Sequence, residues 1–319
     1  MEIANSPLTG GPARKLRELP VAFLASALEE YYQTPPPAGA CDDDYILWEC
    51  IETGLQFARP SKQGNAVFYE WIGQFPTYYP GQRWEYGKVL ELATRGGLLE
   101  DPSNMLLDVG AGRGDFLRQF NRLPTGCRLG IDLSETAVRA MEAEGIRAFC
   151  GTVDEAVQSH FVAKQSCRLV TSFHCLEHVE DPVGFVADLI DLTRSGGCVY
   201  LSTPKSPMSF EARWFDVLNH PPHHLTRWTL AAYRHLAEKM NCSLRFFHPP
   251  ASLARDVLRQ FKLIRHGTAS VSRMRPVKES LIHPFQVSRC LADQLRHRHL
   301  YGKPYSDVIL VELRKNAKP

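Results

Sequence analysis

The stretch Leu106-Leu-Asp-Val-Gly-Ala-Gly-Arg-Gly-Asp-Phe116 decides the fold, because an apolar strand here breaks into a glycine turn. Gly110, Gly112 and Gly114 alternate, so the backbone can turn sharply and approach a ligand without Cβ clashes. We expect a helix to open at Phe116, with its first N–H groups pointing at whatever lies over the turn. The stretch therefore predicts a nucleotide-type site.

The spacing of the glycines separates two kinds of nucleotide site. A dinucleotide fingerprint, G-x-G-x-x-G, needs a third glycine at position 115, where this chain has Asp115. The alternating pattern from Asp108 to Gly114 instead resembles the first motif of class I S-adenosylmethionine-dependent methyltransferases. The resemblance implies that Asp108 and the three glycines hold the methionine part of that cofactor.

A second strand, Arg128-Leu-Gly-Ile-Asp-Leu133, also ends in an acid, and Ser134 is suited to cap the helix that follows. A carboxylate at this place can accept both hydroxyls of a ribose. Asp132 could instead only cap a turn. We assign Asp132 to the ribose and include Leu133 in the same cofactor site.

Ala148-Phe-Cys-Gly-Thr-Val-Asp-Glu155 is typical of a third strand and its exit loop. In methyltransferases this loop flanks the adenine, so the resemblance places Thr152 and Val153 beside it. The next block runs from Leu169 to Pro204 and contains an apolar strand, the L-E-H-V element, a D-P helix start and a G-G turn. It resembles the family that includes ubiquinone-pathway O-methyltransferases.

This resemblance covers roughly residues 85 to 248 and the final strand at 307–313. It implies an α/β fold with a doubly wound, seven-stranded, mostly parallel sheet, in which strand seven lies antiparallel between strands five and six. We expect an N-terminal addition at residues 1–81 and a methyltransferase domain at 82–319, with a helical insertion at 249–303 before the last strand. Ser172 would lie near the sulfonium.

The N-terminal addition contains a predicted helix at residues 20–32 and two cysteines, Cys41 and Cys50, around a strand. The segment resembles the second half of a small zinc ribbon found in related enzymes, but Thr53 stands where another cysteine would be. Two cysteines cannot complete a four-ligand zinc site, so we expect a degenerate, metal-free version.

Aromatic side chains are concentrated after this ribbon segment. They could pack the addition onto the catalytic sheet or form a wall over the methyl donor and acceptor. The eight residues are Phe68, Tyr69, Trp71, Phe75, Tyr78, Tyr79, Trp84 and Tyr86.

Histidines are the candidates for catalysis. Methyl transfer needs an in-line nucleophile and, for a hydroxyl acceptor, removal of its proton, which suits a group that titrates near neutrality. His174 and His178 flank Glu177 after the fourth strand, and His224 belongs to the cluster at residues 219–229. We expect His174 near the sulfonium and His178 or His224 as the base, although such side chains could instead bond to backbone carbonyls.

A metal-assisted reaction is a further hypothesis. The pattern His174-x-x-Glu177-His178 resembles, with a histidine replacing a glutamate, the E-x-x-E-H metal site of ubiquinone-pathway and small-RNA 3′-terminal 2′-O-methyltransferases. His224 lies four residues before Trp228, as does the fourth ligand of the RNA enzymes. A divalent ion could orient and acidify a hydroxyl, but the departure at His174 leaves the ligand set unassigned.

Bulk composition is that of an ordinary enzyme. The chain has 319 residues, 44% hydrophobic and 23% charged, enough to bury a sizeable core. It has no apolar run long enough for a membrane span, and its start lacks the features of a secretory signal. Nine cysteines without paired spacing indicate reduced thiols. We expect a cytoplasmic protein.

Charge is distributed unevenly. Residues 249–303 contain eleven basic and three acidic residues, a net charge of +8, so the remainder carries −6 within a total of +2. Such a surface can attract an anionic substrate, a carrier protein, nucleic acid or an anionic membrane, unless it is only a solvated helical face. Its aromatics are Phe261, Phe285 and Tyr301, too few for a single-stranded nucleic acid platform.

The sequence thus predicts an S-adenosylmethionine-dependent enzyme that methylates an oxygen of a small molecule or glycoconjugate. Two alternatives are metal-assisted RNA 2′-O-methylation and a cofactor-binding module without activity. The acceptor is not encoded in the shared motifs, because acceptor contacts in this family come from the variable additions.

Overall fold

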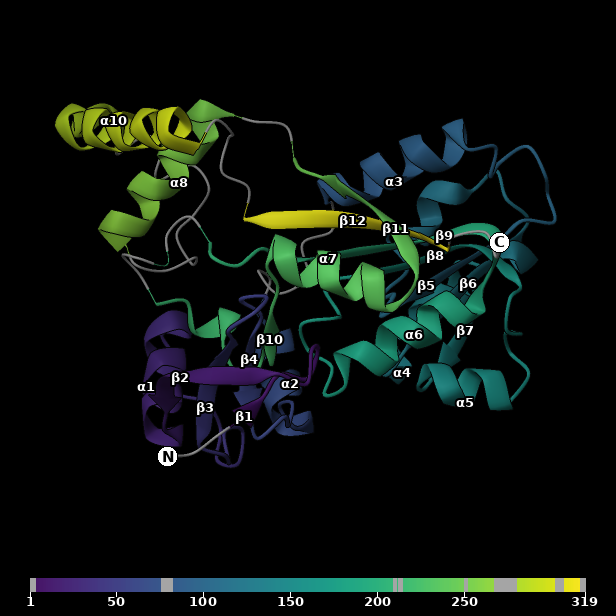
Figure 1. The fold of residues 1–319 in the computed structure, drawn as a ribbon, viewed down its shortest axis with the longest axis horizontal. Helices are drawn as coiled ribbons and strands as arrows, with labels where there is room; N and C mark the ends of the chain where they lie inside the picture. Colours follow the sequence, from purple (N-terminus) through teal and green to yellow (C-terminus); the bar gives the residue numbers. More distant parts are fainter. Residues whose placement is uncertain are drawn as a thin grey trace.

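Two β-sheets organise the protein, as the computed structural model shows for residues 4–75, 83–208, 211, 215–249, 252–266, 280–301 and 307–315 (Figure 1). The larger sheet has seven strands in the order β11-β12-β9-β8-β5-β6-β7, and the smaller has five in the order β1-β2-β3-β4-β10. The larger sheet is the predicted one.

In the seven-stranded sheet, the five strands from β9 to β7 are parallel, whereas β12 runs antiparallel to both β9 and β11. This confirms the predicted fold class, including the place of the last strand. Most residues of these parallel strands are buried, as expected for a sheet covered by helices on both faces. The strands are β5 (Met105–Val109), β6 (Arg128–Asp132), β7 (Arg147–Cys150), β8 (Cys167–Phe173), β9 (Thr193–Pro204), β11 (Cys242–Phe247) and β12 (Val308–Lys315).

Helices pack on both faces of this sheet. Side chains of α5, α6 and α7 join the core on one face, and those of α3 and α4 join the core on the other. Side-chain caps begin four of them, including the predicted cap Ser134, which accepts a hydrogen bond from the amide of Ala137. The helices are α3 (Trp84–Arg95), α4 (Glu135–Ala143), α5 (Val153–Gln158), α6 (Pro182–Leu192) and α7 (Leu230–Lys239).

One predicted element is wrong. The helix expected to open at Phe116 is only a four-residue 3₁₀ helix, η1 (Leu117–Phe120). Pro124 lies four residues further on and cannot donate a helical hydrogen bond, so the segment has no room for a full helix. Its apolar side chains pack into the core beneath the glycine turn instead. Two more such turns are η2 (Thr125–Cys127) and η3 (Val217–Asn219).

The five-stranded sheet combines the N-terminal residues with a strand from far along the chain. The predicted helix α1 (Val21–Tyr32) is present. The sequence did not predict the strand before it, because that strand is rich in charged residues and most of its side chains are exposed. The elements are β1 (Ala4–Asn5), β2 (Pro12–Leu19), β3 (Tyr45–Cys50), β4 (Gln56–Arg59), β10 (Thr226–Arg227) and α2 (Ala66–Gly73).

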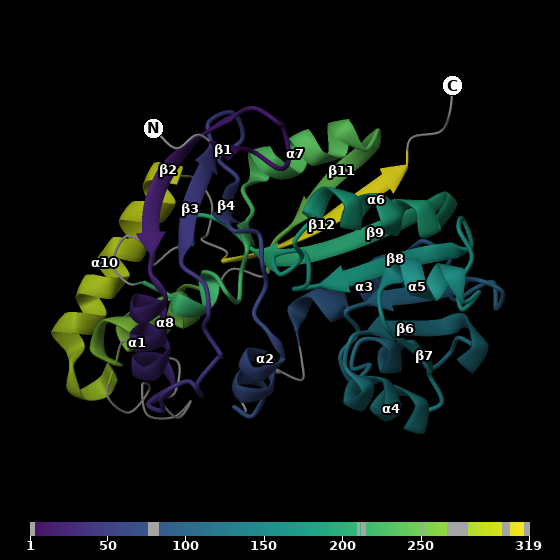
Figure 2. The same cartoon turned by 90° about the horizontal axis from the view of Figure 1, so that it is seen from below.

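Two helices, α8 (Leu253–His266) and α10 (Pro284–Tyr301), lie in the predicted insertion and pack on each other. In both overall views they lie at the end of the molecule away from β6 and β7 (Figures 1 and 2). None of the helices in the described ranges is both long and apolar enough to traverse a bilayer. The domain boundaries at 81/82 and 249–303 stay predictions.

Candidate functional site

The glycine turn after β5 has one closed side and one open side. Gly110 has a φ of +73°, and a Cβ there would come within 3.1 Å of the sulfur of Cys175. Gly112 has a φ of +54°, yet a Cβ there would meet no atom within 4 Å, and its amide donates to Oδ2 of Asp132 at 2.7 Å. Gly114 also has positive φ and packs against Met141. A ligand can therefore approach the backbone at Gly112.

Asp132 does what the cap interpretation expected, because its Oδ1 accepts from the amide of Ser134 at 2.9 Å. Each carboxylate oxygen has two lone pairs, so both oxygens can still accept a ribose hydroxyl. Leu133, beside it, is 67% exposed, so its side chain is open to a ligand. The ribose assignment for Asp132 and the place of Leu133 in the cofactor site stay predictions.

Asp108 lies beneath the turn rather than on its surface. Its side chain is buried, and its Oδ1 accepts from the hydroxyl of Thr171 at 2.7 Å. Burial raises the pKa of this carboxyl to about 8, since a buried carboxylate loses its hydration. A direct contact between Asp108 and the methionine part stays a prediction.

Three further cofactor residues occupy structural positions. Thr152 is the N-cap of α5 and forms a capping box with Glu155. Val153, the next residue, is buried in the core, and Ser172 is buried near the end of β8. Their adenine and sulfonium contacts stay predictions.

His174 is held between two carboxylates. Its Nε2 lies 2.9 Å from Oε1 of Glu85 in the first turn of α3, and its Nδ1 lies 3.4 Å from Oε1 of Glu177. Burial lowers the pKa of His174, but the bonds to Glu177 and Glu85 outweigh burial and leave the pKa raised. Its φ of +52° is uncommon for a residue with a Cβ and is typical of strained functional positions.

Glu85 was missed by sequence reasoning. It is 89 residues away from His174 in the chain, and a glutamate in the first turn of a helix usually needs no explanation beyond the helix dipole. The burial of its side chain marks Glu85 as a functional candidate, but the burial of a single charged residue becomes visible only in the folded structure. The two carboxylates beside His174 stabilise its charged form relative to that of a free histidine and hold its ring in place.

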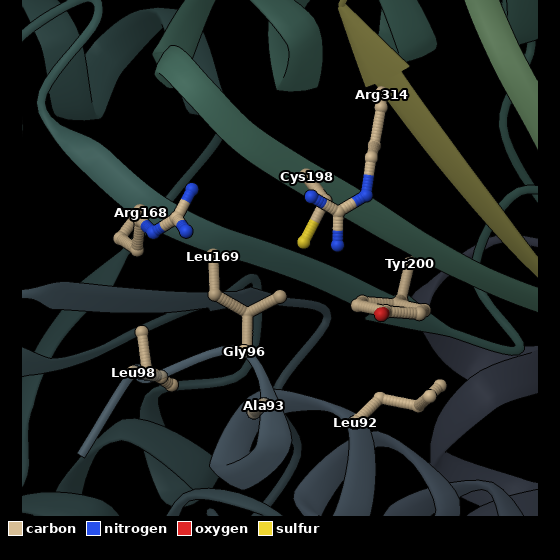
Figure 3. Close-up of a pocket in the computed structure, with 9 residues that line it drawn as sticks. All are labelled: Leu92, Ala93, Gly96, Leu98, Arg168, Leu169, Cys198, Tyr200 and Arg314. Carbon is tan, nitrogen blue, oxygen red and sulfur yellow. The ribbon is translucent and has the colours of Figure 1, made fainter. Parts of the chain in front are cut away.

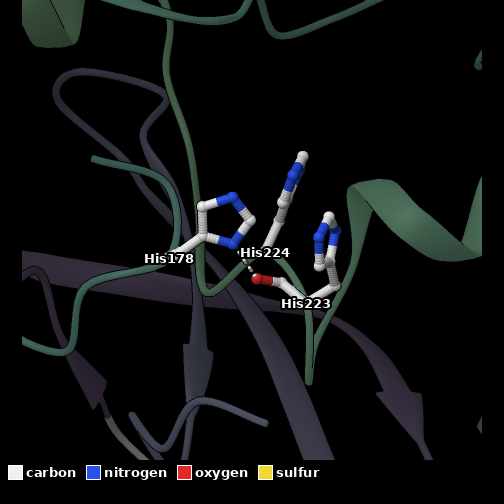
Figure 4. A group of neighbouring side chains, drawn as sticks. All are labelled: His178, His223 and His224. Atoms are coloured by element: carbon white, nitrogen blue, oxygen red, sulfur yellow. Dashed lines mark hydrogen bonds between the residues drawn. The ribbon is translucent and has the colours of Figure 1, made fainter. Parts of the chain in front are cut away.

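Three histidines lie together next to this group, namely His178, His223 and His224 (Figure 4). One nitrogen of each ring lies within 4.8 Å of the others. The cluster joins the loop after β8 to the loop before β10. Sequence reasoning selected His178 and His224 but did not assign a role to His223, which was visible only as one of three histidines in the second cluster.

In each ring Nδ1 is already committed to an acceptor. His178 donates from Nδ1 to the carbonyl of His223 at 2.6 Å, and His223 donates to the carbonyl of Leu218 at 2.8 Å. His224 donates to Oδ1 of Asn219 at 3.1 Å. Because these oxygens can only accept, the proton of each neutral ring is on Nδ1, and the lone pair is on Nε2.

Burial lowers the pKa of all three histidines, and the neighbouring rings lower those of His223 and His224 further. All three rings are therefore neutral near pH 7 and present lone pairs rather than protons. The remaining histidine of the second cluster, His220, donates to the carbonyl of Asp216, and burial beside Arg227 lowers its pKa to about 3. It has the structural role that the alternative expected.

Glu177 supplies negative charge to the same place. It is 1% exposed, and Oε1 lies 4.0 Å from Nε2 of His224. Oε2 has no hydrogen-bond partner among the residues that the structure describes. The carbonyl oxygen of Glu177 accepts from the amides of Leu225 and Thr226, which fastens the two histidine loops together. Three neutral imidazoles and a buried carboxylate are a donor set that suits a divalent cation such as zinc.

The aromatic segment contacts both the N-terminal sheet and the histidine cluster, and its role as a wall over donor and acceptor stays a prediction. Phe68 and Trp71 are buried in the core of the N-terminal sheet. The ring centre of Tyr69 lies 6.4 Å from that of His178 and 6.2 Å from that of His223. Tyr86 packs on Phe173 at the end of β8. Tyr78 and Tyr79 lie outside the described residues.

A pocket at the opposite end of the sheet is separate from this site. It lies beside α3, where β8 begins, and is lined by apolar side chains together with Arg168, Cys198 and Arg314 (Figure 3). None of the predicted cofactor or catalytic residues lines it. The candidate site is therefore at the carboxyl ends of the parallel strands, where open α/β sheets bind ligands.

The geometry agrees with comparisons to known proteins. A family described as a methyltransferase domain matches residues 82–245. This chain belongs to that family. S-adenosylmethionine is its cofactor, and the comparisons favour an enzyme over a silent binding module.

Relatives of this methyltransferase include two bacterial proteins named ubiquinone biosynthesis O-methyltransferase. That of Cupriavidus pinatubonensis is 33% identical over 101 residues, 31% of this chain and 40% of that protein. That of Leptothrix cholodnii is 29% identical over 157 residues, 48% of this chain and 57% of that protein. The chain thus spans about half the length of these relatives.

Solved structures of methyltransferases are similar to the chain over most of its length. An S-adenosylmethionine-dependent methyltransferase from Archaeoglobus fulgidus has 13% identity and a TM-score of 0.47, over 72% of this chain and 94% of that one. Phosphoethanolamine N-methyltransferase 2 from Haemonchus contortus was solved with S-adenosyl-L-methionine. It has 18% identity and a TM-score of 0.46, over 78% of this chain and 56% of that one.

We expect Asp132→Ala to weaken binding of S-adenosylmethionine at least tenfold, roughly the 1.4 kcal/mol of a lost bidentate hydrogen bond. Isothermal titration calorimetry measures the change. Glu135→Ala, which removes an exposed acid from the next helix, is the matched control and should bind as the parent does. An unchanged dissociation constant for Asp132→Ala would contradict the ribose assignment.

Asp108→Asn should change how stability depends on pH. The folded carboxyl has a pKa raised to about 8 from an ordinary value of 3.8, so between these values the folded state holds a proton that the unfolded state has lost. Stability of the parent therefore falls as pH rises through this window, by up to about 1.4 kcal/mol per pH unit relative to the amide variant. Urea unfolding of both proteins at several pH values tests this, and parallel curves would sink it.

Proposed function

We propose that the protein transfers the methyl group of S-adenosylmethionine to a hydroxyl oxygen of a small molecule or glycoconjugate. The observation that carries the proposal is the group of three neutral histidines with Nε2 lone pairs in the loops after β8 and before β10. A hydroxyl acceptor must lose its proton when its oxygen attacks, and a neutral imidazole is suited to accept it.

The proposed methyl-donor site and the proposed acceptor site are close, because the short segment after β8 contributes residues next to both. Cys175 packs against Gly110 in the turn, and Glu177 and His178 follow within three residues. A methyl donor bound over the turn would therefore have this segment as a neighbour. The oxygen then attacks the methyl carbon, the bond from carbon to sulfur breaks, and S-adenosylhomocysteine leaves.

His178 is the base in this proposal. It is the partly exposed member of the cluster, whereas His223 and His224 are buried. Its Nδ1 proton is tied to the carbonyl of His223, which fixes the ring and leaves Nε2 to accept the proton. Tyr69 lies over the same ring and would limit the shape of the acceptor.

A divalent cation is compatible with the same residues. The Nε2 lone pair of His224 and the Glu177 carboxylate, 4.0 Å apart, repel each other unless a proton or a cation lies between them. Glu177, His178, His223 and His224 are the residues that would hold the ion. A bound divalent ion would lower the pKa of an acceptor hydroxyl and orient it.

The names of the relatives support oxygen as the acceptor atom. Both proteins described above are named as O-methyltransferases of ubiquinone biosynthesis. The family match at residues 82–245 does not include α2, which carries Tyr69, or β4, the partner strand of β10. The acceptor is for this reason proposed as a class and not as a compound.

His178→Gln should lower kcat about 10²- to 10⁴-fold, the contribution typical of a general base, and should leave cofactor binding unchanged. Because burial lowers the pKa of His178, the parent rate should stay constant as pH falls through 6.5 and decline only at lower pH. The readout is methyl transfer from labelled donor to an extract of small metabolites, with pools of phenols, sugars and RNA oligomers alongside.

His235→Gln is the control for this variant, because His235 lies on α7 and pairs with Glu52 away from the cluster. It should retain the parent rate. Full activity of both His178→Gln and His224→Gln would overturn the proposed chemistry, and methylation confined to the RNA pool would replace the acceptor class.

Chelation decides between the two ways of activating the hydroxyl. If a divalent ion takes part, dialysis against a chelator should abolish turnover, and one added divalent metal should restore it. Glu177→Gln should then lower metal content, measured by mass spectrometry, in step with activity. Turnover that is insensitive to the chelator would leave His178 acting alone.

A further inference from the structure

The outward face of α10 and the short segment just before this helix together carry the largest group of exposed apolar side chains among the described residues. Phe285 is 90% exposed and Leu281, just before the helix, is 81% exposed. Exposed single apolar residues are ordinary, but several on one helical face mark an interaction surface. The group is Leu281, Ile282, Phe285, Leu291 and Leu295.

This face is not the one that α10 uses to pack. Cys290 is buried against Val257 and Phe261 of α8, and Nε2 of Gln294 donates to Oε1 of Gln260 at 2.9 Å. The side chains of Phe285, Leu291 and Leu295 lie on the other side of the helix by the 3.6-residue period. The hairpin of α8 and α10 therefore has a fixed inner seam and an apolar outer face.

Arginines border the apolar face. Arg289 and Arg296 follow Phe285 by four and eleven residues, which places them along one edge of the same face. Both are exposed, and neither has an ion-pair partner within the described part of the chain. The acid nearest in sequence, Asp293, is turned inward and accepts from Gln260. The outer face thus combines apolar side chains with positive charge only.

The hairpin is attached at the carboxyl edge of the parallel sheet. It follows β11, whose last residue Phe247 pairs with Leu310, and it precedes β12, whose first residue Val308 pairs with Pro204 at the end of β9. The amide of Lys205 donates to the carbonyl of Asp307 at 2.9 Å at this point. Both ends of the insertion are therefore at the carboxyl edge of the sheet, where the glycine turn follows β5 and the histidine loop follows β8.

We propose that the outer face of α10 docks on an anionic lipid surface, with Leu281, Phe285 and Leu295 entering the headgroup region and Arg289 and Arg296 contacting lipid phosphates. An apolar helical face bordered by basic side chains is the pattern of helices that lie in a membrane interface. A second copy of the chain is disfavoured as the occupant, because residues 249–303 carry a net +8 and would repel their counterpart. The inference goes beyond the methyl-transfer proposal and holds for any acceptor.

The test is co-sedimentation of the full chain with vesicles of phosphatidylcholine alone and with vesicles that also contain phosphatidylglycerol. The parent should bind only the anionic vesicles, and added salt should weaken binding. Leu281→Ser with Phe285→Ser should weaken it roughly tenfold or more. Arg289→Gln with Arg296→Gln should weaken it about fivefold per arginine.

Matched controls separate this surface from general effects. Ile51→Ser removes an apolar side chain that is 65% exposed on the N-terminal sheet, and Arg139→Gln removes an exposed arginine of α4. Both should bind vesicles as the parent does. Calorimetry with S-adenosylmethionine should give the parent affinity for every variant, which shows that the fold is intact and is a readout separate from methyl transfer.

Equal binding to neutral and anionic vesicles, or full binding by the Leu281 and Phe285 variant, would overturn the proposal. Analytical ultracentrifugation tests whether a second copy of the chain binds this face instead. A dimer of the parent that becomes monomeric in this variant, with no vesicle binding by either protein, would assign the face to a second copy.

Discussion

The buried carboxylate of Glu177 is the constraint around which the site is arranged. Burying a carboxylate away from water without compensation costs several kcal/mol of folding free energy, so neighbouring groups must stabilise its negative charge. His174 does so from one side and is itself held by Glu85 of α3. On the other side, His224 turns a lone pair toward the same carboxylate. A proton or a bound cation between Glu177 and His224 would compensate this charge.

The parallel sheet was predictable because its signals are local. Each strand is a short apolar run that ends in a glycine turn, an acid or a helix cap, and the order of these blocks implies the topology. The errors occurred where tertiary context decides. Pro124 shortens the segment after Phe116 to a 3₁₀ turn, and β2 forms from charged residues because β3 offers it a partner edge.

The sequence predicted several residues of the site but not the contacts between them. The motifs indicated Asp132, His178 and His224, since residues at the ends of parallel strands meet at one edge. No sequence pattern indicates that Glu85 reaches His174 from another helix. Nor does one indicate that two backbone carbonyls and one side-chain amide oxygen fix the tautomers of three rings. These features depend on which backbone groups become neighbours after folding. The same limit applies to Asp108, whose burial changes its protonation.

Strand β10 has one more consequence. Thr226 and Arg227 pair with Phe57 and Gln56, so the histidine loop is stitched into a sheet made almost wholly by residues that lie before the matched family domain. A protein cut at residue 82 would lose this pairing and leave an open strand edge beside the histidines. The loop that carries His223 and His224 is thus held by residues from outside the matched domain. Sequence changes in residues 4–75 can therefore act on this histidine loop while the glycine turn after β5 stays as it is.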